Sequence, residues 1–539
     1  MFIRNDAPDS PANLLWRKVE KTCLCVLVFS AAIAFVYDGI QLSWRVAERE
    51  KIAGLGASPW IAGWKADVND GQLKSFREGL PVLLVTAIAL IVGKKVLTNE
   101  KAVKSSLQFY AITGPASMVY LHGFGIIYLF TWLFANFLFA KICRGKRLFP
   151  LIVWGVNLSF LVLTEYYEGY GFKWLGLESL ERLYHPDMPW HRTSNLCFLK
   201  LISYLMDSHW AALGARTITK EKHMQKCQEC SLSIDCLRYR QDTHVEDYGG
   251  MAFTGYMTYF PLYLAGPTLS YNAWRSQVQR PQQTFSLSAK LIYLFRLLFA
   301  YLLLELSVHF LYFPTIANNS NNTKLWEGFD AYELAIASYL VLKWIWLKFL
   351  VIWRFFRLWA ICDGIEAPEN MGRCMSNNYC FEGFWRMWHR AFNQWLVRYL
   401  FVPLGGSRYK VYNIWVVFGF VAIWHDLRLH LLIWGWGMCI FIVPEVLAKA
   451  YFSLPRFSEF RKSPVYNWLC AMGGGAYIIL MMVANLVGFS FGLRGLTTIW
   501  EEIVHGEGLF LLGKAWILAT FGAHLMFAFR QSEGLNKGY

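Results

Sequence analysis

The sequence predicts an all-α polytopic membrane protein. Of its 539 residues, 56% are apolar, and the mean hydropathy is +0.31. Soluble domains contain roughly 45–50% apolar residues. The excess is arranged in runs of about 20 residues, the length at which an α-helix crosses a bilayer. The formal charge of +15 fits Lys- and Arg-rich cytoplasmic loops beside these runs, or a basic mouth for an anionic cofactor or lipid headgroup. We expect no nucleic-acid partner.

Twelve apolar runs are candidate membrane spans. The first has basic residues before it and no convincing cleavage site, so we expect a signal anchor. The third and fourth are expected to form a hairpin between basic loops. The runs are 22–41, 79–97, 107–122, 124–142, 148–166, 250–271, 289–313, 331–353, 411–426, 430–449, 467–490 and 507–530.

Three stretches depart from a simple span. Residues 196–214 and 384–402 mix apolar and charged side chains, so each is expected to lie in the membrane interface or to re-enter the membrane. Residues 250–271 contain two prolines and glycines around Tyr263. This composition indicates a kinked helix that lines a cavity, or one that is merely kinked for packing.

Two histidines follow tryptophans in apolar surroundings, as Trp388-His389 and Trp424-His425. His425 closes the run 411–426, and an ionisable group at membrane depth usually faces a cavity or a partner. An uncharged imidazole is a natural base for a hydroxyl that attacks a thioester. The alternative is a packed histidine hydrogen-bonded to a carbonyl.

Polar and glycine residues near these histidines are candidate substrate contacts. Asn393 lies four residues after His389 and is expected to share its helix face, where it would orient the ring or bind an acyl carbonyl. Gly405 marks a chain reversal that allows close approach of a ligand, or a plain turn. Three arginines suit the phosphates of coenzyme A, or simply flank membrane segments: Arg386, Arg390 and Arg398.

The cysteines do not form a complete metal motif. Cys227 and Cys230 have the spacing of half a zinc site, with Cys236 nearby, but no second close pair follows. The alternative is a solvated loop with unpaired or lipidated thiols. We therefore predict no metal site.

These motifs together resemble the membrane-bound O-acyltransferase superfamily, most closely its glycerol-uptake-protein (Gup-type) branch, with hedgehog acyltransferase as a cousin. The resemblance implies a bundle of about 10–12 transmembrane and re-entrant helices around a catalytic tunnel. It places N-terminal spans at 1–195, the catalytic core at 196–530 and a short polar tail at 531–539. The segments that carry it are Tyr263–Pro267, Trp388–Asn393, Tyr399–Gly406 and Trp424–Asp426.

The resemblance also implies an activity. We expect an enzyme of the endoplasmic reticulum membrane that transfers a long-chain acyl group from acyl-CoA, its co-substrate, to a hydroxyl of a lipid acceptor, in lyso-lipid or glycosylphosphatidylinositol-anchor remodelling, with no other cofactor. His425 would be the catalytic base and His389 the second catalytic position. Cys374 resembles a possible haem ligand of hedgehog-type relatives. The substrate-binding candidates are Trp388, Trp424, Asn393, Tyr263, Gly405, Arg386, Arg390 and Arg398.

Other functions stay open at this stage. A polyol transporter or transport regulator is one alternative, although transporters often contain internal repeats and none is evident. A protein acyltransferase of the hedgehog type is another, but such enzymes have a carboxylate where this chain has His389. The third is an inactive scaffold.

Overall fold

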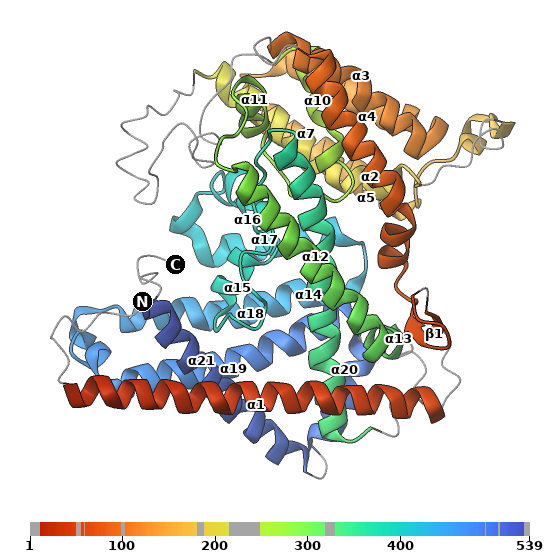
Figure 1. Ribbon diagram of the computed structural model, residues 1–539. Coiled ribbons are helices and arrows are strands. Elements are labelled where there is room, and N and C mark those ends of the chain that lie inside the picture. Colours follow the sequence, from red (N-terminus) through yellow and green to blue (C-terminus); the bar gives the residue numbers. More distant parts are fainter. Residues whose placement is uncertain are drawn as a thin grey trace.

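The chain folds into a helical bundle, shown in Figure 1. The structure is a computed structural model that describes residues 11–49, 55–58, 60–98, 103–179, 188–214, 248–318, 329–490, 492–504 and 507–532. Strands are limited, within these ranges, to a short antiparallel hairpin of β1 (Leu55–Ala57) and β2 (Lys65–Asp67). The prediction of an all-α polytopic membrane protein is confirmed.

Nine helical segments in the described ranges are long and apolar enough to cross a membrane. They are Lys18–Glu48, Gly71–Leu97, Val103–Cys143, Phe149–Tyr166, Leu287–Phe310, Ala331–Cys362, Leu429–Phe452, Pro464–Phe489 and Gly508–Gln531. The two spans expected at 107–122 and 124–142 are joined without a loop, by the 3-10 turn η1 (Gly123–Gly125), into the single 41-residue segment Val103–Cys143.

The bounds of the long helices are as follows. They are α1 (Pro11–Arg49), α2 (Gly71–Leu97), α3 (Val103–His122), α4 (Ile126–Cys143), α5 (Phe149–Tyr166), α7 (His191–Ala212), α12 (Leu287–Phe310), α14 (Ala331–Cys362), α18 (Leu429–Phe452), α19 (Pro464–Phe489) and α21 (Gly508–Ser532). The shorter ones are α10 (Gly250–Met257), α11 (Tyr271–Gln279), α13 (Phe313–Asn318), α15 (Phe381–Met387), α16 (Arg390–Leu396), α17 (Lys410–His425) and α20 (Gly492–Val504).

The helices form two groups with α15, α16 and α17 between them (Figure 1). One group contains α2 to α5, α7, α10 and α11. The other contains α1, α18, α19 and α21, in which the first and last helices of the chain pack together. Helix α14 contacts members of both groups and α12.

Helix α7 is a central helix of the protein rather than an interfacial one. It packs against α4, α5, α10 and α11, and its residues from Cys197 to His209 are all buried. For this reason an interfacial position for 196–214 is wrong, whereas the alternative of a re-entrant segment stays a prediction. Its charged side chains do not mark a wet face, because they are buried against partners from other segments, as Asp207 is against Arg398 and Lys200 against the Met257 carbonyl.

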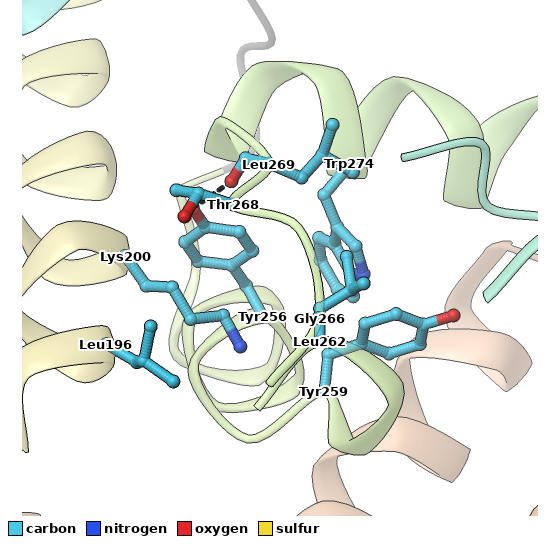
Figure 2. A pocket seen from close by; sticks show the side chains of 9 residues that line it. All are labelled: Leu196, Lys200, Tyr256, Tyr259, Leu262, Gly266, Thr268, Leu269 and Trp274. Carbon is cyan, nitrogen blue, oxygen red and sulfur yellow. Dashed lines mark hydrogen bonds between the residues drawn. The ribbon is translucent and has the colours of Figure 1, made fainter. Parts of the chain in front are cut away.

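The span predicted at 250–271 is also wrong. Helix α10 ends at Met257, and only the 3-10 turn η3 (Phe260–Leu262) and an irregular segment follow before α11. Pro261, Gly266 and Pro267 cannot sustain a helix here. The irregular backbone (Figure 2) is buried in protein, which is where such backbone is tolerated at membrane depth.

Candidate active site

The segment 384–402 is not one helix, because the chain breaks at His389. Helix α15 ends at Met387 and α16 begins at Arg390. His389 lies between them in the left-handed region, with φ 47° and ψ 48°. Few non-glycine residues adopt this conformation. Among the non-glycine residues that the structure describes, only Glu168 shares a positive φ.

A crossing segment holds this break in place. The Asn370 carbonyl accepts a hydrogen bond from the Arg390 amide (3.0 Å), and its side-chain Oδ1 accepts one from the Ala391 amide (3.1 Å). The Gly372 amide donates to the Met387 carbonyl (3.0 Å). The conformational strain at His389 is therefore imposed by its surroundings, as is common at functional sites.

An aromatic wall brings the two histidines together. The centroid of the His389 ring lies 4.5 Å from that of Trp353 and 5.1 Å from that of Phe392. The His425 ring lies 5.5 Å from Phe489. Trp424 contacts both histidines, at 6.1 Å from His389 and 4.9 Å from His425. The pairing of these histidines expected from the sequence is thus seen in space.

The shared Trp424 is fixed by helix α7. Its indole Nε1 donates to the Asn195 carbonyl (2.9 Å), and the Asn195 amide Nδ2 donates to the Trp424 carbonyl (2.9 Å). This reciprocal pair ties the C-terminal end of α17, and with it His425, to the central helix. Helix α17 has 16 residues and ends at His425. At 1.5 Å per residue it is about 24 Å long, which is short of a bilayer core.

Both imidazoles are accessible and lack hydrogen bonds. His425 is exposed and His389 is half-buried, and neither ring has a hydrogen-bond partner in the described chain. Other histidines are engaged: His122 contacts the Met188 carbonyl (2.7 Å), and His309 contacts Ser58 Oγ (2.7 Å). The alternative of a packed, carbonyl-bonded histidine does not describe His389 or His425.

The residues next to the histidines in sequence do not orient them. Asp426 pairs with Arg428, with Oδ2 2.6 Å from Nε. Asn393 donates its backbone amide to the His389 carbonyl (3.0 Å). Because His389 lies before the helix, the argument that Asn393 shares its helix face fails. Trp388 stacks on Phe384, with ring centroids 5.7 Å apart.

Of the three candidate arginines, only Arg390 has no charged partner in the described ranges. Arg386 lies 2.6 Å from Glu382, which is also reached by Lys410 and Lys449. Burial raises the pKa of Glu382, but these cations outweigh it and the pKa is lowered overall. Arg390 is exposed beside His389 and is the arginine best placed to meet an anionic substrate.

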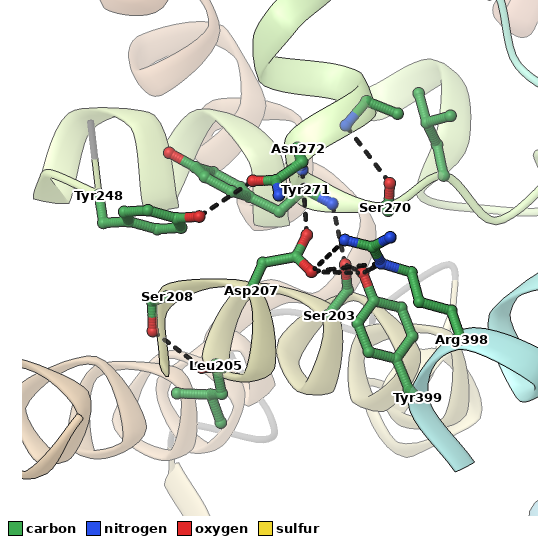
Figure 3. Close-up of polar contacts among 12 residues, drawn as sticks. Ser203, Leu205, Asp207, Ser208, Tyr248, Ser270, Tyr271, Asn272, Arg398 and Tyr399 are labelled. Carbon is green, nitrogen blue, oxygen red and sulfur yellow. Dashed lines mark hydrogen bonds and ion pairs between the residues drawn. The ribbon is translucent and has the colours of Figure 1, made fainter. Parts of the chain in front are cut away.

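Arg398 belongs to a buried polar network, shown in Figure 3. Its guanidinium Nη2 lies 3.1 Å from Oδ1 of Asp207, a fully buried carboxylate on α7. Tyr399 donates to the same oxygen (3.0 Å), and the Asn272 amide donates to Oδ2 (3.2 Å). This network holds the π-helical turn η6 (Val397–Phe401), which continues α16, against α7. In this structure Arg398 therefore positions η6.

Tyr263 and Gly405 lie in structural settings. The Tyr263 hydroxyl is buried between His122 Nε2 (2.8 Å) and Thr193 Oγ1 (2.9 Å). Gly405 is exposed in a turn, with φ 95°. Neither setting involves the histidines, so the substrate-binding role of each stays a prediction.

The structure tests little of what the sequence suggests for the cysteines. Cys227, Cys230 and Cys236 lie outside the described residues. The thiol of Cys374 is 3.3 Å from the Lys343 amine, and the expectation of no cofactor besides acyl-CoA stays a prediction.

With this geometry in view, the comparisons with known proteins are decisive. Residues 184–489 match the family described as MBOAT, the membrane-bound O-acyltransferase family. The chain belongs to this family. It is 34% identical to the membrane-bound O-acyltransferase gup1 of Schizosaccharomyces pombe over 88% of this chain and 83% of that protein. It is 30% identical to GUP1 of Saccharomyces cerevisiae, with 98% and 94% covered.

Hedgehog-type relatives are more distant. The mouse protein-cysteine N-palmitoyltransferase HHAT is 26% identical over 49% of this chain and 52% of that protein. The resemblance to the Gup-type branch is confirmed, and the protein is a multi-pass membrane-bound O-acyltransferase. The family match begins near the expected boundary at 195, but α7 runs through that residue without a break, and the domain division stays a prediction.

The sequence did not predict several residues that contact the two histidines or hold Trp424 in place. They come from distant helices and carry no local signal: Trp353 on α14, Asn195 on α7, Trp434 on α18 and Phe489 on α19. Asn370 was missed for the same reason.

Proposed function

We propose that this O-acyltransferase moves a long-chain acyl group from acyl-CoA to a hydroxyl of a lipid acceptor in the endoplasmic reticulum membrane, in the remodelling of lyso-lipids or glycosylphosphatidylinositol anchors. One observation carries the proposal. Two accessible imidazoles, His389 and His425, have no hydrogen-bond partner among the described residues and contact the same indole in an otherwise apolar aromatic wall.

The proposed chemistry needs one base and a dry setting. His425 takes the proton of the acceptor hydroxyl as its oxygen attacks the thioester carbonyl carbon. A C–O bond forms, the C–S bond breaks, and coenzyme A leaves as a thiolate that recovers the proton. The surrounding Trp424, Trp434 and Phe489 rings favour the neutral imidazole, and the bound acyl chain is proposed to complete the exclusion of water that would hydrolyse the thioester.

We assign His389 and Arg390 to binding of the acyl-CoA substrate. Neither nitrogen of the His389 ring has a partner in the part of the chain that the structure describes, so one can donate to the acyl carbonyl oxygen while the ring stays stacked on Trp353. The neighbouring Arg390 is an exposed cation suited to a phosphate of coenzyme A. A histidine in place of a carboxylate at position 389 favours a hydroxyl acceptor over the N-terminal amine of a protein.

The test is acyl transfer by purified protein in nanodiscs. Labelled palmitoyl-CoA is offered with lyso-lipids, lyso-anchors and N-terminal cysteine peptides, using wild type, His425→Ala and the control His430→Ala. We expect product on a hydroxyl acceptor, a loss of about a hundredfold or more in His425→Ala, and an unchanged rate in the control.

Each other outcome favours a different function. A wild-type rate in folded His425→Ala contradicts the proposed base. Product on the peptide amine alone indicates the hedgehog-type activity. Glycerol flux through liposomes with no acyl transfer indicates the transporter, and acyl-CoA binding without turnover indicates the scaffold.

A further inference from the structure

The amine of Lys343 and the thiol of Cys374 form a close pair outside the proposed active site. Lys343 lies on α14, and Cys374 lies in the irregular segment between α14 and α15. The Lys343 Nζ donates to the Cys374 Sγ across 3.3 Å. Both side chains are half-buried, so a small solute can reach the two atoms.

The fold sets the approach of the thiol to the amine. The Cys374 carbonyl accepts a hydrogen bond from the Asn377 amide (2.9 Å), which closes a turn around the cysteine. A second contact joins the same two elements two residues further on, because the hydroxyls of Tyr339 on α14 and Ser376 lie 3.0 Å apart. The pair is therefore held from both sides rather than formed by two free side chains.

A thiol beside an ammonium is suited to oxidation. The positive charge favours the thiolate, which is the form that attacks a peroxide and becomes a sulfenic acid. A sulfenic acid couples with a nucleophile in reach, and at Cys374 the atom in reach is the Lys343 Nζ. A bridge through one oxygen requires less approach of the nitrogen to the sulfur than a direct S–N bond does.

We propose that Lys343 and Cys374 are a redox modification site at which hydrogen peroxide forms an N–O–S cross-link. In the first step the O–O bond of one peroxide breaks, an S–O bond forms, and water leaves the sulfenic acid behind. In the second step the sulfenic oxygen bonds to Nζ. The hydroxyl hydrogen and one amine hydrogen, with two electrons, then reduce a second peroxide to two waters.

The cross-link would connect two elements that border the proposed active site. Helix α14 carries Trp353, which stacks on His389, and the segment of Cys374 carries Asn370 and Gly372, which hold the break at His389. Oxidation would thus limit movement of one element against the other. Only this consequence rests on the proposed function, and the cross-link itself does not.

The test is peptide mapping of the full chain in nanodiscs after exposure to hydrogen peroxide. We expect a linked pair of peptides that joins Lys343 to Cys374 and is released by dithiothreitol. Its mass should exceed the sum of the two free peptides by one oxygen less two hydrogens, about 14 Da. Oxidation of Cys374 without a link to Lys343 overturns the proposal, as does an unmodified Cys374. A linked pair that lacks the oxygen contradicts the N–O–S bridge.

Three variants make the test specific. Lys343→Arg keeps a cation beside the thiol but removes the amine, so the link should disappear and trapping of the sulfenic acid by dimedone should rise several-fold. Cys374→Ser should lose both products. Cys380→Ser is the matched control, because Cys380 lies in the same segment but its Sγ accepts from the Gly383 amide (3.4 Å), so the link should persist. Equal dimedone trapping at Cys374 in Lys343→Arg and wild type contradicts the assignment. None of these readouts depends on acyl transfer.

Discussion

The imidazole of His389 lies flat on the indole of Trp353, with centroids 4.5 Å apart and planes inclined by 21°. This stack depends on the left-handed backbone at His389, which turns the side chain out of the helical path between α15 and α16. The geometry of the proposed site thus rests on a backbone conformation that a histidine adopts only at a cost.

Substituting His389 should separate that cost from the chemistry. His389→Gly removes the ring and the left-handed penalty, whereas His389→Ala removes the ring alone. We expect the glycine variant to be the more stable by about 1 kcal/mol, and both to lose acyl transfer. Thermal unfolding and initial rates measure the two effects. An alanine variant as stable as the glycine variant would show that the backbone there is unstrained.

The Asp207–Arg398 pair should behave as a coupled unit. Asp207→Asn or Arg398→Met leaves a buried charge without its partner, so each is expected to destabilise the protein by about 3 kcal/mol. The double variant should lose less than the sum. Ser208→Ala is the control, since Ser208 bonds only within its own helix, to Leu205. Strict additivity in the unfolding cycle would show that the pair is not coupled.

Asp67 should make stability depend on pH. Burial raises its pKa to about 6, against hydrogen bonds from Thr315 that lower it. The folded protein therefore binds a proton more tightly than the unfolded chain. The contribution of the protonated Asp67 to the free energy of unfolding is fully present below the unfolded pKa of 3.8. It is lost as the pH rises through about 6.

Asp67→Asn should remove this dependence. Between pH 4 and 6 the unfolding free energy of the wild type relative to Asp67→Asn is expected to fall by up to about 3 kcal/mol. Denaturant unfolding at stepped pH measures it. Parallel pH profiles for the two proteins would rule out Asp67 as the titrating group.

Gly405 and Gly406 form a matched pair for testing the turn before α17. A Cβ on Gly405 would lie 2.6 Å from the Tyr409 ring at φ 95°, whereas one on Gly406 meets nothing within 4 Å at φ 58°. We expect Gly405→Ala to cost about 2 kcal/mol and Gly406→Ala about 1 kcal/mol. If Gly405 also contacts the substrate, Gly405→Ala should raise the KM for acyl-CoA. An unchanged KM would show that Gly405 serves only the turn.

Local sequence was sufficient for the long apolar helices, because length and hydropathy decide them. It also singled out His425 as a candidate, because this residue is polar and closes an apolar run, and its catalytic role stays a prediction. It was insufficient for α7. The charges of Lys200 and Asp207 look like a wet face until their surroundings from η6, α10 and α11 are known. Those contacts join residues far apart in the chain, which no periodicity records.

The break at His389 was missed for a related reason. Trp388 and His389 have no helix-breaking character, and the segment carrying Asn370 imposes the left-handed turn from outside. At 250–271 the sequence predicts a helix kinked by its prolines, whereas in the structure the helix ends before them. Their effect depends on whether neighbouring protein can bury the irregular backbone, as it does here.

The contact between α1 and α21 has a consequence for biosynthesis. Glu20 and Lys21 near the start of the chain meet His524 (3.3 Å) and the ring of Phe529 (4.1 Å) near its end. The ribosome makes these partners at opposite ends of translation. Helix α1 therefore acquires α21 as a neighbour only after about 460 further residues have been made, and a nascent chain stalled before residue 507 contains α1 without this contact.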